Sequence, residues 1–276
     1  MRKNTFSHAL NILVLVCLTI TASAADTAKP LKALLISGGC CHDYNKQNVI
    51  IPEGVNARAN FTWEIIQEGG TSSDHRVSIY EKPGWAAGYD IIVHNECFSE
   101  ISDPAFIENV LAEHRNGVPA VVIHCTMHTF RALKTDNWRE FLGVKTTHHG
   151  PQHPLDVRNM AGTNPIMKGF PEVWTTGPEE LYAIDKVFPT ATVLGSAMEK
   201  RKDKETNKWV DTTKDNPVIW INNYGKGRVF GTTLAHNNAT MQNPKYLDAL
   251  ARGMLWACDK LDDKGDPKTG YGPAKP

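Results

Sequence analysis

Histidines that stand beside apolar runs are the residues of this sequence best suited to chemistry. The 276-residue chain has eleven histidines, and His42, His124 and His236 each come where an apolar run gives way to a polar loop. His149 lies in a further loop, residues 148–154, which contains three histidines together with glycine and proline. Neutral imidazoles bind zinc and other borderline divalent ions. We therefore predict that these four histidines form a site for a divalent metal ion, with zinc favoured.

Cys125 is a second candidate for chemistry because it directly follows His124. A cysteine on a sharp turn after a strand can act as a nucleophile, and nearby imidazoles could lower the pKa of its thiol. No glycine flanks Cys125, although such turns favour glycine. A purely packing role is the alternative, and both remain open. The predicted catalytic residues are His124, His236 and Cys125.

Substrate-binding residues are predicted beside these histidines. Asp43 follows the first of them, and His153 belongs to the histidine-rich loop. Glu180 and Tyr182 precede a short predicted strand. Carboxylates and neutral imidazoles can hold and deprotonate hydroxyl groups, so we assign these four residues to substrate binding.

Apolar runs in the first half predict the strands that would position the site. Residues 31–37 form an apolar run bounded by Gly38 and Gly39, which is typical of a buried parallel strand. Helix-like and strand-like patterns then alternate, which predicts a parallel βαβ sheet with right-handed crossovers. The predicted elements are a helix over 57–68, strands over 76–80 and 89–95, a helix over 103–115 capped by Asp103, and a strand over 118–124.

The positions of the histidines on these strands predict a shared site. Carboxyl ends of parallel strands meet at one edge of a sheet, and ligands bind beyond that edge. His42, His94 and His124 stand at or just after the ends of three predicted strands. We expect all three at this edge, and we expect the four predicted metal ligands to meet there in one pocket.

The second half of the chain has shorter strand patterns separated by turns. We predict strands over 155–158, 191–197, 217–222 and 228–234, a hairpin turn at 224–227 and a closing helix over 244–258. Residues 262–276 are rich in Gly, Pro and Lys and are predicted to form a disordered tail. The folded domain is expected over residues 31–258.

The N-terminal sequence predicts export. Arg2 and Lys3 precede an apolar run over residues 12–20, and the small residues at 22–24 form a cleavage pattern. This is typical of a secretory signal peptide, and the run is too short to span a bilayer. We predict a signal peptide over residues 1–24 and a periplasmic or secreted mature protein that does not span the membrane.

Charge and cysteine content narrow the class further. The chain has 30 basic and 30 acidic residues and is 41% hydrophobic, which fits a globular protein and argues against a nucleic-acid partner. Removal of residues 1–24 would take one of the six cysteines and leave five, with no disulfide-scaffold spacing. Cys97 and Cys258 are interpreted as small buried side chains. Cys40 and Cys41 could bridge only with strain, although an exported chain could form one disulfide.

The order of these motifs resembles the ThuA-like family, which is named for trehalose utilisation. The matching segments are residues 38–43, 89–93, the strand ending at His124, and residues 149–154, 164–166, 180–182 and 224–236. The resemblance covers residues 31–258. It implies an α/β, flavodoxin-like fold similar to class I glutamine amidotransferases, with a mostly parallel sheet and helices on both faces. It also implies carbohydrate catabolism, with a small-molecule carbohydrate of the trehalose or keto-disaccharide type as partner.

Three functions remain open at this point. The leading interpretation is an exported protein of carbohydrate catabolism with a histidine-lined, metal-binding crevice. The second is a Cys125-dependent hydrolase or amidotransferase-like enzyme, although no His-x-Glu pair near the C-terminus completes an amidotransferase triad. The third is a non-catalytic sugar-binding accessory protein. The three differ in whether Cys125 is essential and whether a metal is bound.

Overall fold

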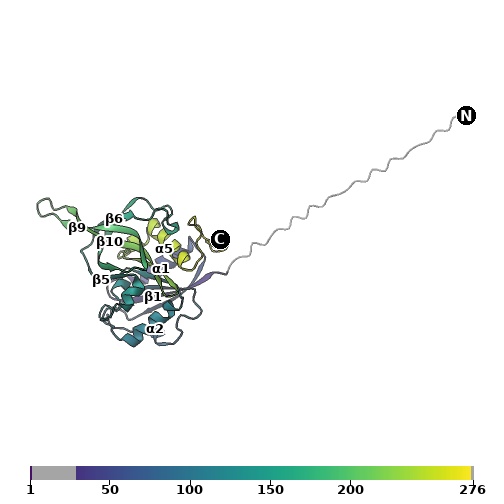
Figure 1. Ribbon diagram of the computed structural model, residues 1–276, viewed down its shortest axis with the longest axis horizontal. Coiled ribbons are helices and arrows are strands. Elements are labelled where there is room, and N and C mark those ends of the chain that lie inside the picture. Colours follow the sequence, from purple (N-terminus) through teal and green to yellow (C-terminus); the bar gives the residue numbers. More distant parts are fainter. Residues whose placement is uncertain (2–28, 275–276) are drawn as a thin grey trace.

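A mixed sheet of nine strands runs through the part of the chain that this computed structural model describes, Met1 and residues 29–274 (Figure 1). Its parallel half has the order β2 (Phe61–Glu68), β1 (Leu31–Gly39), β3 (Ile91–Cys97), β4 (Ala120–Ile123) and β11 (Gly227–Thr232). The antiparallel half continues with β10 (Trp209–Tyr224), β9 (Ala191–Lys202), β6 (His153–Asn159) and β7 (Val173–Glu179). A separate pair is formed by β5 (Val144–His149) and β8 (Tyr182–Val187). The predicted α/β class is confirmed.

Alternation along the strands divides the core between the two faces of the sheet. In β1, Leu35 packs on the face covered by α1 (Tyr44–Asn56) and α5 (Pro244–Ala257). The next residue, Ile36, packs on the face covered by α2 (Pro104–Arg115) and α3 (Asn137–Leu142). Successive strand side chains point to opposite faces, so a run that is apolar at every position is buried on both. The predicted placement of helices on both faces is confirmed.

Two predicted elements of the first half are wrong. Residues 57–68, expected as a helix, end in the edge strand β2, and the helix precedes them as α1 in a segment expected to begin as a loop. Phe61, Trp63 and Ile65 are types that favour strands, and pairing with β1 decides the outcome. Residues 76–80, expected as a strand, lead into the 3-10 turn η1 (Ser78–Glu81). Because β2 and β3 already occupy both edges of β1, no place beside it remains for them.

The second half largely follows the prediction. The expected strands correspond to β6, β9, β10 and β11, and Tyr224 pairs with Gly227 across the predicted hairpin turn. The closing helix is α5, which follows the short helix α4 (Asn238–Met241). The turn η3 (Pro165–Met167) lies between β6 and β7.

The segment after α5 differs from the expected disordered tail. The backbone amide of Asn60 donates a hydrogen bond to the carbonyl of Tyr271, at 3.0 Å, and the Tyr271 ring packs against the core. Leu261 and Pro267 form a β-bridge. Residues 262–274 are therefore part of the fold, because one aromatic ring packed on the core anchors a segment that is otherwise rich in glycine and proline.

The predicted signal peptide, residues 1–24, contains only Met1 among the residues that the structure describes. Within the described part of the chain, no helix is both long and apolar enough to cross a membrane. The first strand, β1, begins at Leu31.

Three parallel strands end at the same edge and deliver the candidate residues there. The register aligns Gly39 of β1 with Cys97 of β3, and β4 continues directly into the 3-10 turn η2 (His124–Met127). Gly39 has a φ of 93°, which glycine adopts without strain, and the chain turns here toward His42. A Cβ at Gly39 would also overlap the carbonyl oxygen of Cys97. The end of β1 therefore requires glycine for its backbone conformation and for its contact with β3.

Gly39→Ala should destabilise the protein more than Gly88→Ala. Gly88 has a similar φ of 89°, but an added methyl group there would meet nothing within 4 Å, so it carries only the cost of the left-handed backbone, about 1–2 kcal/mol. Gly39→Ala adds the overlap with β3, worth about 1–3 kcal/mol more. Urea unfolding of the two variants measures the difference. Equal losses would show that the end of β1 can move away from β3 without cost.

Candidate functional site

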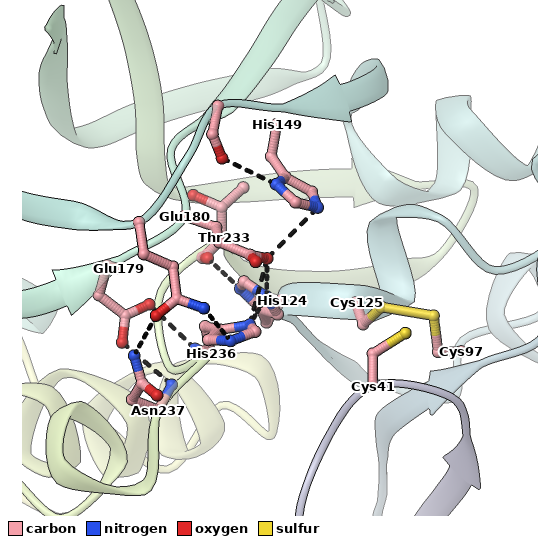
Figure 2. A network of polar contacts seen from close by, with 12 residues as sticks. Cys41, Cys97, His124, Cys125, His149, Glu179, Glu180, Thr233, His236 and Asn237 are labelled. Atoms are coloured by element: carbon pink, nitrogen blue, oxygen red, sulfur yellow. Dashed lines mark hydrogen bonds and ion pairs between the residues drawn. A yellow bond between two sulfur atoms is a disulfide. The ribbon is translucent and has the colours of Figure 1, made fainter. Parts of the chain in front are cut away.

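Three imidazoles from distant parts of the chain converge beyond the ends of β1, β4 and β11. His42, His124 and His236 offer ligand atoms that all lie within 4.8 Å of one another. His124 Nε2 and His236 Nδ1 are 3.3 Å apart, and Figure 2 shows the two rings beside Glu180. These three side chains could hold a metal ion.

His124 is oriented by the backbone behind it. Its φ is 42°, in the left-handed region. Its Nδ1 lies 2.6 Å from the carbonyl oxygen of Thr233 (Figure 2). A carbonyl can only accept, so Nδ1 carries the proton and Nε2 presents its lone pair to the cluster. A carbonyl in this position is a common way of orienting a metal-binding histidine.

His42 is a neutral imidazole with an unused nitrogen. Burial, followed by the nearby His124 and His236, lowers the pKa of His42 to about 3. Among the described residues, its buried Nδ1 has no hydrogen-bond partner. An unpartnered buried nitrogen is costly, and a metal ion or a ligand hydroxyl would satisfy it.

Glu180 supplies the negative charge of the cluster. Its Oε2 lies 3.1 Å from His236 Nδ1, 3.3 Å from His149 Nε2 and 3.5 Å from His124 Nε2. Burial would raise the pKa of Glu180, but the His124 and His236 imidazoles beside its carboxylate outweigh burial and hold the pKa below its usual range. The same contact with Glu180 raises the pKa of His236. A carboxylate paired with His236 therefore lies next to the neutral ring of His42.

Glu179 and Gln152 position His236, and neither role could be read from the sequence alone. The buried Glu179 carboxylate accepts the backbone N–H groups of His236, at 2.9 Å, and Asn237, at 3.2 Å (Figure 2). Gln152 Nε2 lies 2.8 Å from His236 Nε2. Ala235, directly before His236, is buried and has a φ of 77°. Glutamates next to one another at 179 and 180 were the signal in the sequence, but only the fold shows which one binds the backbone.

A pocket of about 420 Å³ opens on this cluster. Tyr182 is buried close by, with its ring centre 5.0 Å from that of His124 and 5.3 Å from that of His149. Burial raises the pKa of Tyr182 well above its usual value, so its hydroxyl stays protonated. Of the residues predicted for the site, those lining the pocket are His42, Cys125, His149, Glu180 and His236.

Three of the four residues predicted to bind substrate, namely Tyr182, Asp43 and His153, lie outside the pocket lining. Asp43 caps α1, accepting the backbone N–H of Lys46, and pairs with the Lys46 ammonium at 2.9 Å. His153 is buried on β6 with its ring centre 4.5 Å from that of Trp209. The contacts of Asp43 and His153 are those of a helix cap and of a packed ring.

The expectation that His94 faces the same edge is wrong. His94 lies inside β3 and is fully buried, with Nδ1 2.9 Å from Glu96 Oε1 and Nε2 3.0 Å from His114 Nε2. Burial, followed by His94, lowers the pKa of His114 to about 3. Because β3 runs on to Cys97, His94 stops short of the strand end and packs beneath α2 instead.

Four cysteines are bonded in two pairs, whereas the sequence left room for one disulfide. Cys125 is bonded to Cys97, and Cys40 to Cys41. The interpretation of Cys97 as a simple buried side chain is therefore wrong, and Cys125 offers no free thiol for attack in this state. Adjacency of β3 and β4 brings Cys97 and Cys125 together, and spacing in the sequence does not reveal it. Cys258 is free and half-buried.

The fold and the site define an α/β protein with a histidine–carboxylate pocket at the carboxyl edge of its parallel strands. The family model for ThuA, described as trehalose utilisation, matches residues 42–257, and the chain belongs to the ThuA family. This membership confirms the resemblance predicted from the sequence motifs and links the chain to carbohydrate utilisation. The comparison with curated proteins found no match.

Solved structures show the same fold at low sequence identity. A ThuA-like protein from Parabacteroides merdae is 20% identical, with a TM-score of 0.65 over 90% of this chain and 98% of that one. A ThuA-like protein from Bacteroides uniformis is 16% identical, with a TM-score of 0.65 over 88% and 98%. A β-galactosidase from Bacillus circulans sp. alkalophilus is 13% identical, with a TM-score of 0.52 over 84% of this chain but only 32% of its own. The predicted flavodoxin-like, amidotransferase-like fold class is confirmed.

Proposed function

We propose that this protein acts in carbohydrate catabolism after export, and that His42, His124 and His236 bind a zinc ion in a pocket for a disaccharide. The observation that carries the proposal is the convergence of three imidazoles, from the ends of three strands, within 4.8 Å. Histidines with a purely structural role need only local partners, whereas these three side chains come from distant segments of the sequence and converge at one point.

The donor set fits zinc. Zinc bound by imidazoles at about 2.0–2.1 Å in tetrahedral geometry separates their nitrogens by about 3.3 Å, and His124 Nε2 and His236 Nδ1 are 3.3 Å apart. The Thr233 carbonyl that orients His124 and the unpartnered Nδ1 of His42 are both typical of histidines that bind a metal ion. Three histidine ligands would leave one position for a substrate oxygen, where bound zinc would polarise it.

The rest of the pocket supports a polar substrate. Glu180 is positioned to accept a hydrogen bond from a substrate hydroxyl, since its carboxylate is ionised and reaches the cluster. Arg131 lines the same pocket and can donate to sugar oxygens. The volume of about 420 Å³ lies within the range for small-molecule sites. Family membership favours trehalose or an oxidised, keto-type disaccharide as the class of substrate.

Zinc binding tests the proposed metal centre. After treatment with EDTA, the protein should take up one equivalent of zinc, and His124→Ala should weaken binding by more than about 100-fold because it removes a ligand. His75→Gln, which changes a histidine paired with Glu68 away from the pocket, is the matched control and should bind as the wild type does. Isothermal titration gives both affinities. Unchanged affinity in His124→Ala would refute the three-histidine centre.

Sugar binding and turnover test the substrate class separately. The zinc-loaded protein should bind trehalose or its keto derivatives, measured by calorimetry, and the EDTA-treated protein should bind them more weakly. Glu180→Gln should keep binding but lower any turnover by about 100-fold or more, because the negative charge beside the proposed zinc and the substrate hydroxyl is lost. Binding without turnover in the wild type would favour the accessory-protein alternative. A protein that binds none of these sugars would contradict the proposed substrate.

Export is tested at the N-terminus. The basic, apolar and small residues of positions 2–24 support cleavage after Ala24. Mature protein recovered from its native cells should therefore begin at or near Ala25 by N-terminal sequencing. Recovery of chains that retain the leader, with no shorter form, would contradict export through cleavage.

A further inference from the structure

Four cysteines gather on one wall of the pocket, at the ends of β1, β3 and β4. We propose that Cys40, Cys41, Cys97 and Cys125 form a thiol–disulfide relay, in which a small-molecule thiol opens the outer pair, Cys40–Cys41, and the reducing equivalents pass to the inner pair, Cys97–Cys125. The relay is an activity of its own and does not rest on the proposed metal or sugar.

The two disulfides are in contact. Cys40 Sγ lies 3.7 Å from Cys97 Sγ, close to the van der Waals separation of two sulfurs. The same Cys97 sulfur is bonded to the sulfur of Cys125 (Figure 2). A thiolate released on Cys40 therefore has a disulfide sulfur as its neighbour, which is the arrangement that exchange through a mixed disulfide requires.

Exposure sets the direction of the relay. Cys41 is exposed and Cys40 is half-buried, whereas Cys97 is 3% exposed and Cys125 is 7% exposed. A thiol in solution can reach the outer pair more readily than the inner pair. Reduction of the inner pair is then faster through Cys40 than by direct attack.

The backbone keeps Cys40 against Cys97 when the outer pair opens. The register of β1 and β3 places Gly39 opposite Cys97. The Tyr44 hydroxyl donates a hydrogen bond to the carbonyl of Cys40, at 3.1 Å. Both contacts are independent of the Cys40–Cys41 bond, so the released sulfur stays at its target.

The exchange steps balance. A thiolate R–S⁻ attacks Cys41 Sγ, the Cys40–Cys41 bond breaks, and Cys40 leaves as a thiolate with RS bonded to Cys41. A second R–S⁻ attacks the RS sulfur, forming RSSR and releasing Cys41 as a thiolate. Cys40 then attacks Cys97 Sγ and displaces Cys125, and Cys41 attacks Cys40 Sγ and displaces Cys97.

The net reaction oxidises two small-molecule thiols to one disulfide and reduces the Cys97–Cys125 disulfide to two thiols. A small-molecule disulfide reverses every step. The pocket therefore catalyses exchange between the two, with the Cys97–Cys125 pair as the store of two electrons.

Reduction kinetics test the relay. Every protein in this experiment is the full chain with Cys17→Ser, which removes the cysteine of the predicted signal peptide. The oxidised protein is treated with reduced glutathione and quenched with acid at set times. Free thiols are then alkylated with N-ethylmaleimide and located by mass spectrometry. Opening of the Cys97–Cys125 pair should be at least 10-fold slower in Cys40→Ser/Cys41→Ser than in the parent, whereas Cys258→Ser, a thiol outside the pocket lining, should match the parent. Equal opening rates in the double variant and the parent would overturn the relay.

A trapping experiment tests the contact itself and does not depend on the first result. Cys41→Ser/Cys125→Ser leaves Cys40 and Cys97 in the pocket. When oxidised glutathione is added as the oxidant, these two cysteines should form a disulfide with each other. The matched control, Cys40→Ser/Cys125→Ser, leaves Cys41 and Cys97 and should bridge at least 10-fold more slowly. Failure of Cys40 and Cys97 to bridge in a variant whose circular dichroism is that of the folded parent would overturn the proposal. Equal rates of disulfide formation in the two variants would refute the assignment of Cys40 as the residue whose sulfur attacks Cys97.

Discussion

Parallel pairing of β4 with β11 is the constraint on which the pocket depends. The register sets Ile123 opposite Thr232, so the segments that follow β4 and β11 leave the sheet side by side. His124 and His236 follow, and their ring nitrogens meet although 112 residues separate them in the sequence. A shift of one residue in this register would turn the outgoing side chains to the other face of the sheet. The register that buries the apolar side chains of β4 and β11 is therefore the same register that brings His124 and His236 together.

The rule that ligands gather at strand ends predicts the histidines better than local patterns predict the elements. His42 was placed correctly even though α1, which follows it, was expected partly as a loop, because only the end of β1 matters for its position. Residues 57–68 fit both a helical and a strand pattern, and pairing with β1 settles the matter. His94 was misplaced because β3 runs two residues further than its apolar pattern suggests. The Cys97–Cys125 bond depends on the order of strands in the sheet, which no local pattern encodes.

Charge in the cluster is divided between a neutral part and an ionised part. Burial keeps His42 neutral, while the contact between Glu180 and His236 keeps the carboxylate ionised. Several cationic imidazoles could not share so small a volume, and one carboxylate compensates for one of them. An arriving cation would find the lone pairs of His42 and His124 on one side and the Glu180 carboxylate on the other.

Ala235 gives this cluster a property that static contacts do not describe. It holds a φ of 77°, which glycine would adopt at lower cost. Alanine has fewer alternative backbone conformations than glycine, so the peptide that leads into His236 is stiffer. A stiff peptide has little conformational entropy left to lose when a ligand is captured. The strain at this single residue therefore trades folding stability for a preorganised His236, which would reduce the conformational entropy lost on binding the proposed metal ion.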